Sequence, residues 1–240
     1  MRMPLKLFLA GWRQVRRDGM LLALIPAPIL MGAVLRFGLP AAGDMLARSR
    51  GLTLRPWYDL GDSLLVILTP IFPLMVSAFL ILDERDEGTG AYYSVTPACG
   101  GAYLSARLGL PALWGFISTA LIVRAFGLAV GSRPEMVGAA LASTLEAVTA
   151  CMLVVALAAN KVEGLALSKL TNLFILGLPA AWFLQAPHKY LFSLLPSFWI
   201  GEGLLAAAAG GTGVVHILAG IAFALGWMTA LTRLFLRRAW

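Results

Sequence analysis

Long apolar stretches separated by short polar segments dominate the pattern of hydrophobic and polar positions along the chain. A bilayer core about 30 Å thick needs roughly 20 apolar residues for each transmembrane helix. Six stretches approach or exceed that length, at residues 20–37, 60–82, 104–128, 137–159, 164–186 and 213–236. They are too long and too continuous to be the alternating strands of a closed barrel. The pattern therefore predicts an all-α membrane protein with six transmembrane helices in one domain over residues 1–240.

Composition agrees with a lipid environment. Hydrophobic residues make up 60% of the chain and charged residues 13%, whereas soluble proteins have about 45–50% and about 25%. A soluble domain of this size could not bury so much apolar surface. The net charge of +7 does not indicate nucleic acid, because the 19 Lys and Arg lie mostly between the apolar stretches. Since no basic stripe with interleaved aromatic residues occurs, we expect no nucleic-acid partner.

Positive charge also predicts the orientation of the bundle, because cytoplasmic loops carry more Lys and Arg than outer loops. Placing the N-terminus inside puts 12 of the 19 Lys and Arg on the cytoplasmic side and 7 on the opposite side. We therefore predict that both termini are cytoplasmic.

Two segments outside the spans have patterns of their own. Residues 1–18 place apolar and basic side chains on opposite helical faces, which predicts an interfacial amphipathic helix; an unstructured basic tail is the alternative. The apolar positions of that face are Leu5, Phe8, Leu9, Trp12 and Val15. Residues 187–212 are only half polar and end near a glycine cluster, which predicts a re-entrant segment of short helices in the outer leaflet.

Prolines and one acid stand out within the spans. Pro70 and Pro73 predict a kink in the second span and Pro179 one in the fifth, either fixed or bending during transport. Glu146 lies near the middle of the fourth span, where a charge costs about 2.5–3.5 kcal/mol on insertion scales. It is either part of a substrate path or subunit interface, or a glutamic acid hydrogen-bonded to a neighbouring helix.

Motifs for hydrolysis, metal binding and nucleotide binding do not occur in the sequence. His188 and His216 are 28 positions apart, and no HExxH pattern is present. Cys99 and Cys151 form neither a metal-binding pair nor an expected disulfide. A Walker A sequence and a nucleophile elbow are also missing. We therefore expect no catalytic residue, metal or cofactor on this chain, although a membrane enzyme without a recognisable catalytic set stays open.

The densest polar feature follows the second span. Four of the chain's 12 acids fall within residues 83–87, on the predicted cytoplasmic side. Acids contribute little to topology, so that role does not explain them. A short charged helix here could contact a cytoplasmic partner, and a solvated acidic loop is the alternative.

Residues 83–89, with Val95-Thr96-Pro97 after them, resemble the signature that follows the second span of ABC-2 type transporter permeases. Residues 160–169 look like the second cytoplasmic loop of small drug-export members of that family. Residues 195–199, Leu-Pro-Ser-Phe-Trp, are similar to its segment before the last span. With six spans, an N-terminal interfacial helix and a late re-entrant region, the resemblance covers essentially the whole chain.

The resemblance implies the permease subunit of a bacterial ATP-driven exporter in the cytoplasmic membrane. A second permease subunit, identical or paralogous, would pair with it, and separate ABC ATPase subunits would bind ATP and Mg. The first cytoplasmic loop, residues 83–103, would then carry a coupling helix, with residues 160–169 beside it. The implied ATPase-coupling residues are Asp83, Glu84, Arg85, Asp86, Glu87, Gly88, Thr89, Lys161 and Glu163. Gly90-Ala91 stands where the family commonly has an aliphatic residue and glutamate, so this chain departs from the family pattern at that point.

Other functions compatible with the sequence are an intramembrane enzyme acting on lipids or peptides, a non-transporting immunity or assembly protein, and an ATP-driven importer. The apolar bundle with one acid in mid-membrane favours an amphipathic or cationic substrate, either a small molecule or a peptide.

Overall fold

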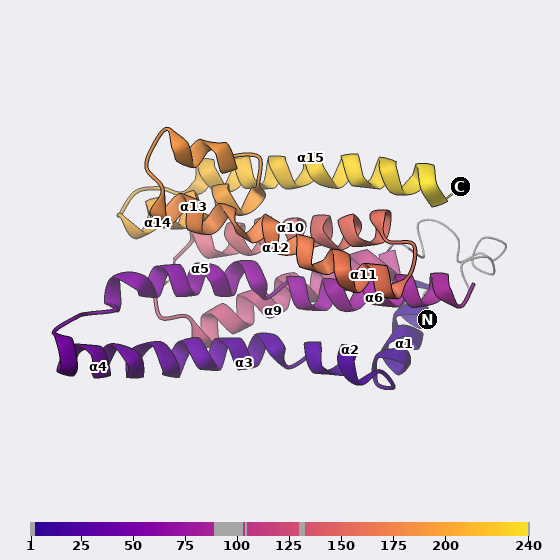
Figure 1. The fold of residues 1–240 in the computed structure, drawn as a ribbon, viewed down its shortest axis with the longest axis horizontal. Coiled ribbons are helices and arrows are strands. Elements are labelled where there is room, and N and C mark those ends of the chain that lie inside the picture. The colour runs from indigo at the N-terminus through magenta and orange to yellow at the C-terminus, as the bar shows by residue number, and fades with distance from the viewer. Residues whose placement is uncertain (1–2, 89–102, 104, 130–132, 240) are drawn as a thin grey trace.

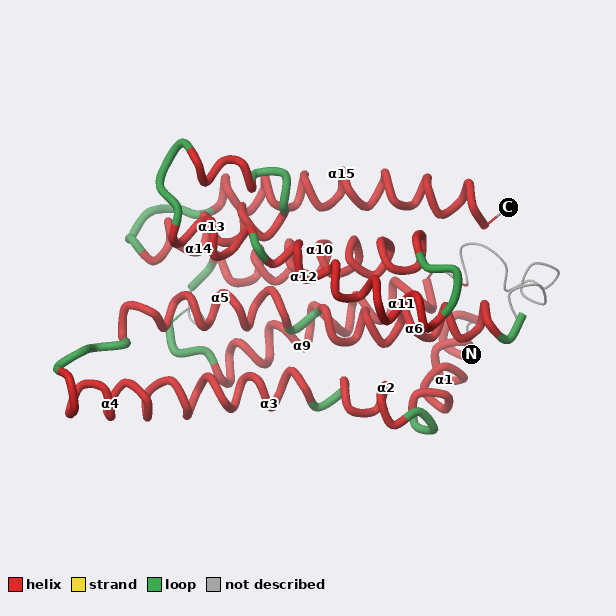
Figure 2. Tube along the Cα trace, viewed as in Figure 1, coloured by secondary structure: helices red, strands yellow, loops and turns green. Residues whose placement is uncertain are grey.

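The computed structural model describes residues 3–88, 103, 105–129 and 133–239. Its regular structure is helical, and these ranges contain no strand (Figure 2). Six helical runs are long and apolar enough to cross a membrane: Gly19–Arg50, Arg55–Asp86, Ser105–Phe126, Glu135–Leu157, Lys161–Phe183 and Val214–Leu234. The prediction of an all-α fold with six spans is therefore confirmed, and the chain is a multi-pass membrane protein.

Most spans consist of several shorter helices in line (Figure 1). Before and within the first span lie α1 (Met3–Val15), α2 (Gly19–Leu24), α3 (Ala27–Ala33), η1 (Val34–Gly38) and α4 (Leu39–Arg50). The second and third spans comprise η2 (Arg55–Trp57), α5 (Tyr58–Leu68), α6 (Ile71–Asp86), η3 (Ser105–Gly109) and α9 (Leu110–Phe126). The fourth and fifth comprise α10 (Glu135–Leu157), α11 (Lys161–Ser168), η5 (Lys169–Thr171), α12 (Asn172–Ile175) and α13 (Gly177–Phe183). The chain then forms η6 (His188–Phe192), α14 (Pro196–Ala208) and α15 (Val214–Ala239).

The second span is interrupted at its prolines. α5 ends at Leu68 and α6 begins at Ile71, with Pro70 between them. A proline within a helix removes one backbone hydrogen bond and crowds the carbonyl four residues earlier. Next to the break, the Leu65 carbonyl accepts two hydrogen bonds from Thr69, one from its backbone N–H over 3.1 Å and one from its hydroxyl over 2.6 Å. The fifth span is likewise divided, since α12 ends before α13 begins at Gly177.

The first span is longer than the sequence predicted, and the predicted end at residue 37 was wrong. Helical structure continues without a break from η1 through α4 to Arg50, and Pro40 lies in the first turn of α4. Gly51 ends the helix with a φ of 68°. Arg48 and Arg50, expected in a loop, therefore lie in the last turn of a helix.

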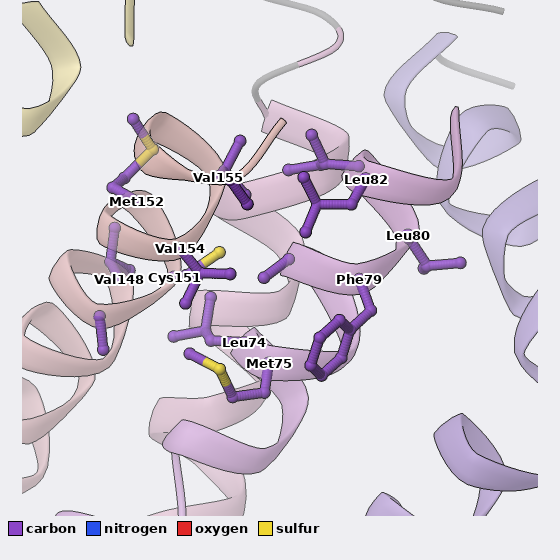
Figure 3. Close-up of a cluster of buried hydrophobic side chains, with 14 of the residues drawn as sticks. Leu74, Met75, Phe79, Leu80, Leu82, Val148, Cys151, Met152, Val154 and Val155 are labelled. Atoms are coloured by element: carbon purple, nitrogen blue, oxygen red, sulfur yellow. The ribbon is translucent and has the colours of Figure 1, made fainter. Parts of the chain in front are cut away.

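α10 is the central helix of the bundle. It packs against α6, α9, α14 and α15. In its most apolar stretch of 18 residues, 78% of the residues are buried, compared with 17% in that of the first span and 22% in that of the last. Figure 3 shows side chains of α6, such as Leu74 and Leu82, facing Val155 and Cys151 of α10. The first and last spans therefore lie at the periphery, and α6 with α10 forms the inner core.

The ends of the bundle carry different elements (Figure 1). The two termini lie at one end, together with α1, the end of α6 and the start of α11. The tip of α4 lies at the opposite end with α13 and α14. Residues 1–18 thus contain a helix, and residues 187–212 contain η6 and α14 rather than a further span. The location of both segments relative to the membrane stays a prediction.

Candidate functional site

The acidic run, for which the sequence allows either a short charged helix or a solvated loop, begins inside a helix. Asp83, Glu84, Arg85 and Asp86 form the last turn of α6, because the apolar positions that anchor this helix continue to Leu82. Glu87 caps the helix and is exposed. Gly88 follows with a φ of 68°, a left-handed conformation that glycine adopts without strain. Thr89, and Val95-Thr96-Pro97 beyond it, lie outside the described residues.

Lys161, the first residue of α11, joins this helix end to two other elements. Its Nζ lies 2.7 Å from Asp18 Oδ2 and 2.9 Å from Asp83 Oδ2. Its backbone N–H donates to Asp86 Oδ2 over 2.9 Å. One residue therefore connects the start of α2, the end of α6 and the start of α11 through charge-assisted hydrogen bonds. We call Lys161, Asp18, Asp83 and Asp86 the Lys161 cluster.

Asp18 also caps α2. Its Oδ1 accepts hydrogen bonds from the N–H groups of Met20 and Leu21, over 2.9 and 3.2 Å. These N–H groups have no partner within the helix, so the carboxylate satisfies them. The hydrogen bond from Lys161 and the one from the Leu21 N–H hold the pKa of Asp18 below its ordinary value. The sequence analysis did not single out Asp18, although its position before an apolar run is typical of a helix cap.

Arg85 points to a different helix. Its Nη1 donates to the Ala158 carbonyl over 2.5 Å and its Nη2 to the Val155 carbonyl over 3.1 Å. The last carbonyls of a helix lack internal partners and carry partial negative charge. Arg85 therefore caps the carboxyl end of α10 and links it to α6.

Glu163 has a local role in the described structure. Asn160 accepts a hydrogen bond from the Glu163 N–H over 2.9 Å, and the Glu163 carboxylate accepts one from the Ala159 N–H over 2.7 Å. This pattern is close to a capping box and starts α11. Residues 160–169, predicted to be a loop, therefore form mainly a helix, and Glu163 lies beside the Lys161 cluster without joining it.

A buried ion pair lies beneath this surface. Arg107 of η3 and Glu84 of α6 are 3% and 5% exposed and pair through Nη2 and Oε1. The Tyr103 hydroxyl donates to the second Glu84 oxygen over 2.8 Å. Gly11 of α1 lies against the Arg107 guanidinium, where any side chain would collide with it. Glu84 thus holds the start of the third span, and Arg107 supports the packing of α1.

The implied coupling residues therefore separate into groups. The structure brings Asp83, Asp86 and Lys161 together at one point, directs Glu84 and Arg85 to two neighbouring elements, and leaves Glu87 and Gly88 exposed at the tip. In the sequence, Arg107 contributes only to the count of Lys and Arg that predicts the orientation of the bundle. Its partner lies 23 positions earlier, and no local pattern in the sequence reveals that pairing.

Glu146 is the second feature of interest, in the centre of the bundle. It is the twelfth of the 23 residues of α10 and is 1% exposed. Ser197, near the start of α14, directs its hydroxyl and its backbone N–H at this carboxyl. The Ser197 hydroxyl also forms a hydrogen bond to the Phe174 carbonyl. Ser197 is therefore the polar partner that the neighbouring helix α14 offers to Glu146.

Comparison with known proteins places the whole chain among transport proteins. The model of a family described as fluoroquinolones export permease protein Rv2686c-like matches residues 11–232. Two curated relatives are the fluoroquinolones export permease proteins MT2760 and Rv2686c, from the CDC 1551 / Oshkosh and H37Rv strains of Mycobacterium tuberculosis. Each is 29% identical over 226 residues, which cover 93% of this chain and 90% of the relative. No solved structure matches the chain.

Proposed function

The chain belongs to the fluoroquinolones export permease protein Rv2686c-like family, and on that premise we propose that it is the membrane subunit of an ATP-driven exporter. A separate ABC ATPase subunit, which binds ATP and Mg, would supply the energy. A second permease subunit, identical or paralogous, would complete the path. Family membership agrees with the resemblance to ABC-2 type permeases, and it establishes the permease class for this chain.

The Lys161 cluster is the observation that carries the ATPase-coupling part of the proposal. A subunit driven from outside the membrane needs a contact surface whose displacement reaches several spans at once. At the end of the bundle that holds both termini, Lys161 ties together α2, α6 and α11. A force applied to the exposed residues that follow α6 would therefore move three spans together, as a rigid-body transition requires.

The substrate proposed for this chain is an amphipathic small molecule. The relatives carry fluoroquinolones in their names, and these are compact aromatic molecules with charged groups. The bundle matches that chemistry in having an apolar interior with a buried acid, Glu146, in the middle of its central helix. We therefore place the transport path beside α10 and the direction of transport outward.

Affinity purification from the native host tests the proposal. We expect a P-loop ATPase to co-purify in stoichiometric amount with the tagged chain, and its ATP hydrolysis to rise when a fluoroquinolone is added. A charge reversal at the exposed tip, Glu87→Lys, should weaken this association. The matched reversal Glu135→Lys, at the opposite end of the bundle, should not. A chain that purifies without an ATPase, or equal effects of the two reversals, would contradict the proposal.

A further inference from the structure

The helix α1 is attached to the bundle along one face. Gly11 is buried beside the Arg107 guanidinium, and Val15 is 2% exposed. α1 packs against α2, α6 and η3, and it runs across the end of the bundle that holds both termini (Figure 1). The face opposite Gly11 and Val15 therefore points away from the bundle.

This outward face carries apolar and basic side chains together. Leu9 and Trp12 are each 44% exposed, and Arg13 and Arg16 are exposed beside them. Positions 9, 12, 13 and 16 follow the spacing of three and four residues that brings side chains to one side of a helix. The Arg16 N–H donates to the Trp12 carbonyl over 3.2 Å, which extends the helical pattern one residue beyond α1. We call Leu9, Trp12, Arg13 and Arg16 the outer face of α1.

The positive charge of this outer face is not compensated within the part of the chain that the structure describes. Neither the Arg13 nor the Arg16 guanidinium forms an ion pair or a hydrogen bond with any described residue. Asp18 is the first acid in the sequence and follows five Lys and Arg. Its carboxylate is already engaged by Lys161 and by the first N–H groups of α2. The two arginines are therefore available to an anion from outside the chain.

The surface next to α1 is suited to lipid. In the most apolar stretch of the first span only 17% of the residues are buried, and Met20 and Leu22 of α2 are 41% and 45% exposed. Acyl chains cover such side chains in a bilayer. Because α1 directly precedes this span and runs across it, its outer face comes to the level of the headgroups. Tryptophan is enriched at that level, and an arginine stem packs there on apolar groups while its guanidinium stays in the polar layer.

We propose that the outer face of α1 is a binding site for a phospholipid with an anionic headgroup. The guanidinium groups of Arg13 and Arg16 bind the phosphate, whose oxygens match their donor geometry. Leu9 and Trp12 contact the upper part of the acyl chains. A zwitterionic lipid has the same phosphate but also a cation that the arginines repel, so charge selects the lipid with a net negative charge. This site goes beyond the proposed export function and belongs to the chain without its partners.

An acidic surface of the ATPase subunit is the competing partner for these arginines. α1 lies at the same end of the bundle as the exposed tip after α6 (Figure 1), where the proposed ATPase contact is. Leu9 and Trp12 alternate with the arginines, however, and the exposed apolar side chains of α2 continue this surface. A ligand that is anionic at one end and apolar over the rest of its length matches both features, which favours the lipid.

Native mass spectrometry of the full chain, purified in detergent, measures the binding of single lipids. We expect phosphatidylglycerol to bind at least about fivefold more tightly than phosphatidylcholine with the same acyl chains. Arg13→Gln combined with Arg16→Gln should abolish this preference, whereas Arg13→Lys combined with Arg16→Lys should retain part of it. The matched control, Arg48→Gln combined with Arg50→Gln, removes two exposed arginines at the opposite end of the bundle and should leave the preference unchanged.

The outcomes separate the partners. Loss of the lipid preference in the double glutamine variant, with the lysine pair and the control still selective, supports the site. A wild-type chain without a preference overturns it before any variant is made, and so does an equal loss in the control. Wild-type selectivity in the double glutamine variant, together with loss of ATPase co-purification, assigns the outer face of α1 to the ATPase and also overturns the lipid site. Because lipid binding is measured on the chain alone, its failure leaves the proposed exporter function standing, and a missing ATPase leaves the lipid site standing.

Discussion

The ion pair between Arg107 and Glu84 shows how a single buried charge supports this fold. Both side chains are almost completely buried, so removal of one leaves the other without its counter-charge. Loss of one partner of a buried pair costs about 3–5 kcal/mol. We therefore expect Arg107→Met to lower the free energy of unfolding by about that amount, measured by denaturation of the detergent-solubilised protein.

A double replacement provides the control for this prediction. If the penalty arises from an uncompensated charge, Glu84→Leu combined with Arg107→Met should be more stable than Arg107→Met alone, because neither charge is then left buried. An Arg107→Met protein as stable as the wild type, or a double variant less stable than the single one, would show that the pair contributes little.

Asp18 makes part of the stability depend on pH. Its pKa is lowered in the folded protein by the hydrogen bonds from Lys161 and from the Leu21 N–H. A carboxyl with a lowered pKa stabilises the fold above its unfolded pKa, near 3.8, and this contribution disappears as the pH falls through the folded value. Asp18→Asn should thus be less stable than the wild type at pH 7. The difference should shrink below about pH 3.8 in thermal unfolding measured from pH 7 to pH 3. A constant difference across that range would contradict this account.

These residues also mark what sequence reasoning could reach at the residue scale. Hydropathy alone identifies Glu146, because an acid inside an apolar stretch is conspicuous. The partners of Lys161 are not visible in this way, since Asp83 and Asp18 lie 78 and 143 positions away. The acidic run was correctly recognised as unusual. Its attachment to α10 and α11 depends on tertiary contacts that no local pattern encodes.

At the scale of elements, glycines decide how closely helices approach. A side chain at Gly177 of α13 would collide with the backbone nitrogen of Phe198 in α14, which cannot move independently of its helix. Gly177→Ala should therefore cost about 1–3 kcal/mol of stability. At Gly226 an added methyl group meets no atom within 4 Å, and Gly226→Ala should instead gain about 0.5–1 kcal/mol from helix propensity. Thermal unfolding of the two variants should shift in opposite directions, and equal shifts would contradict the packing argument.

Lys161 should matter to transport because it joins three elements. In the proposed exporter, Lys161→Met would leave the exposed tip after α6 intact and keep the backbone bond to Asp86, but would remove the side-chain bonds that join α11 to Asp18 and Asp83. We expect ATPase association to persist while fluoroquinolone efflux falls several-fold. Lys161→Arg, which can still form charge-assisted hydrogen bonds, should recover part of the efflux. Loss of the complex in Lys161→Met, or efflux equal to the wild type, would contradict the coupling role.

The six spans were predictable because a bilayer imposes a length of apolar sequence that is easily recognised. The breaks at Pro70 and before Gly177 were also predictable, since proline disrupts helices for local reasons. The extension of the first span to Arg50 was missed because its last turns are polar and contain Pro40, and hydropathy does not register a polar helix. α14 was expected only as a short helix; its burial against α10, α13 and α15 depends on tertiary packing.

At the scale of the whole molecule, polar contacts tie both ends of the bundle. At the end with α4 and α13, Asp62 accepts hydrogen bonds from the Leu128 and Ala129 N–H groups over 2.9 and 2.6 Å. Arg133 pairs there with Asp59 over 2.6 Å. The Lys161 cluster holds the other end. Polar contacts therefore join elements that are distant in the sequence at both ends of the described bundle.

The arrangement of these ends relative to the membrane leads to the last prediction. Both termini, the end of α6 and the start of α11 share one end of the bundle, while the tip of α4 lies at the other. Together with the excess of Lys and Arg on one side, this arrangement predicts that Glu87 is cytoplasmic and Ser49 is external. In a Cys99→Ser background, an impermeant maleimide should label Ser49→Cys in right-side-out vesicles and Glu87→Cys only after permeabilisation. Cys151 is buried and provides little background. The reverse labelling pattern would show that the bundle has the opposite orientation in the membrane. The Lys161 cluster would then lie on the outer side, where no ATPase can reach it.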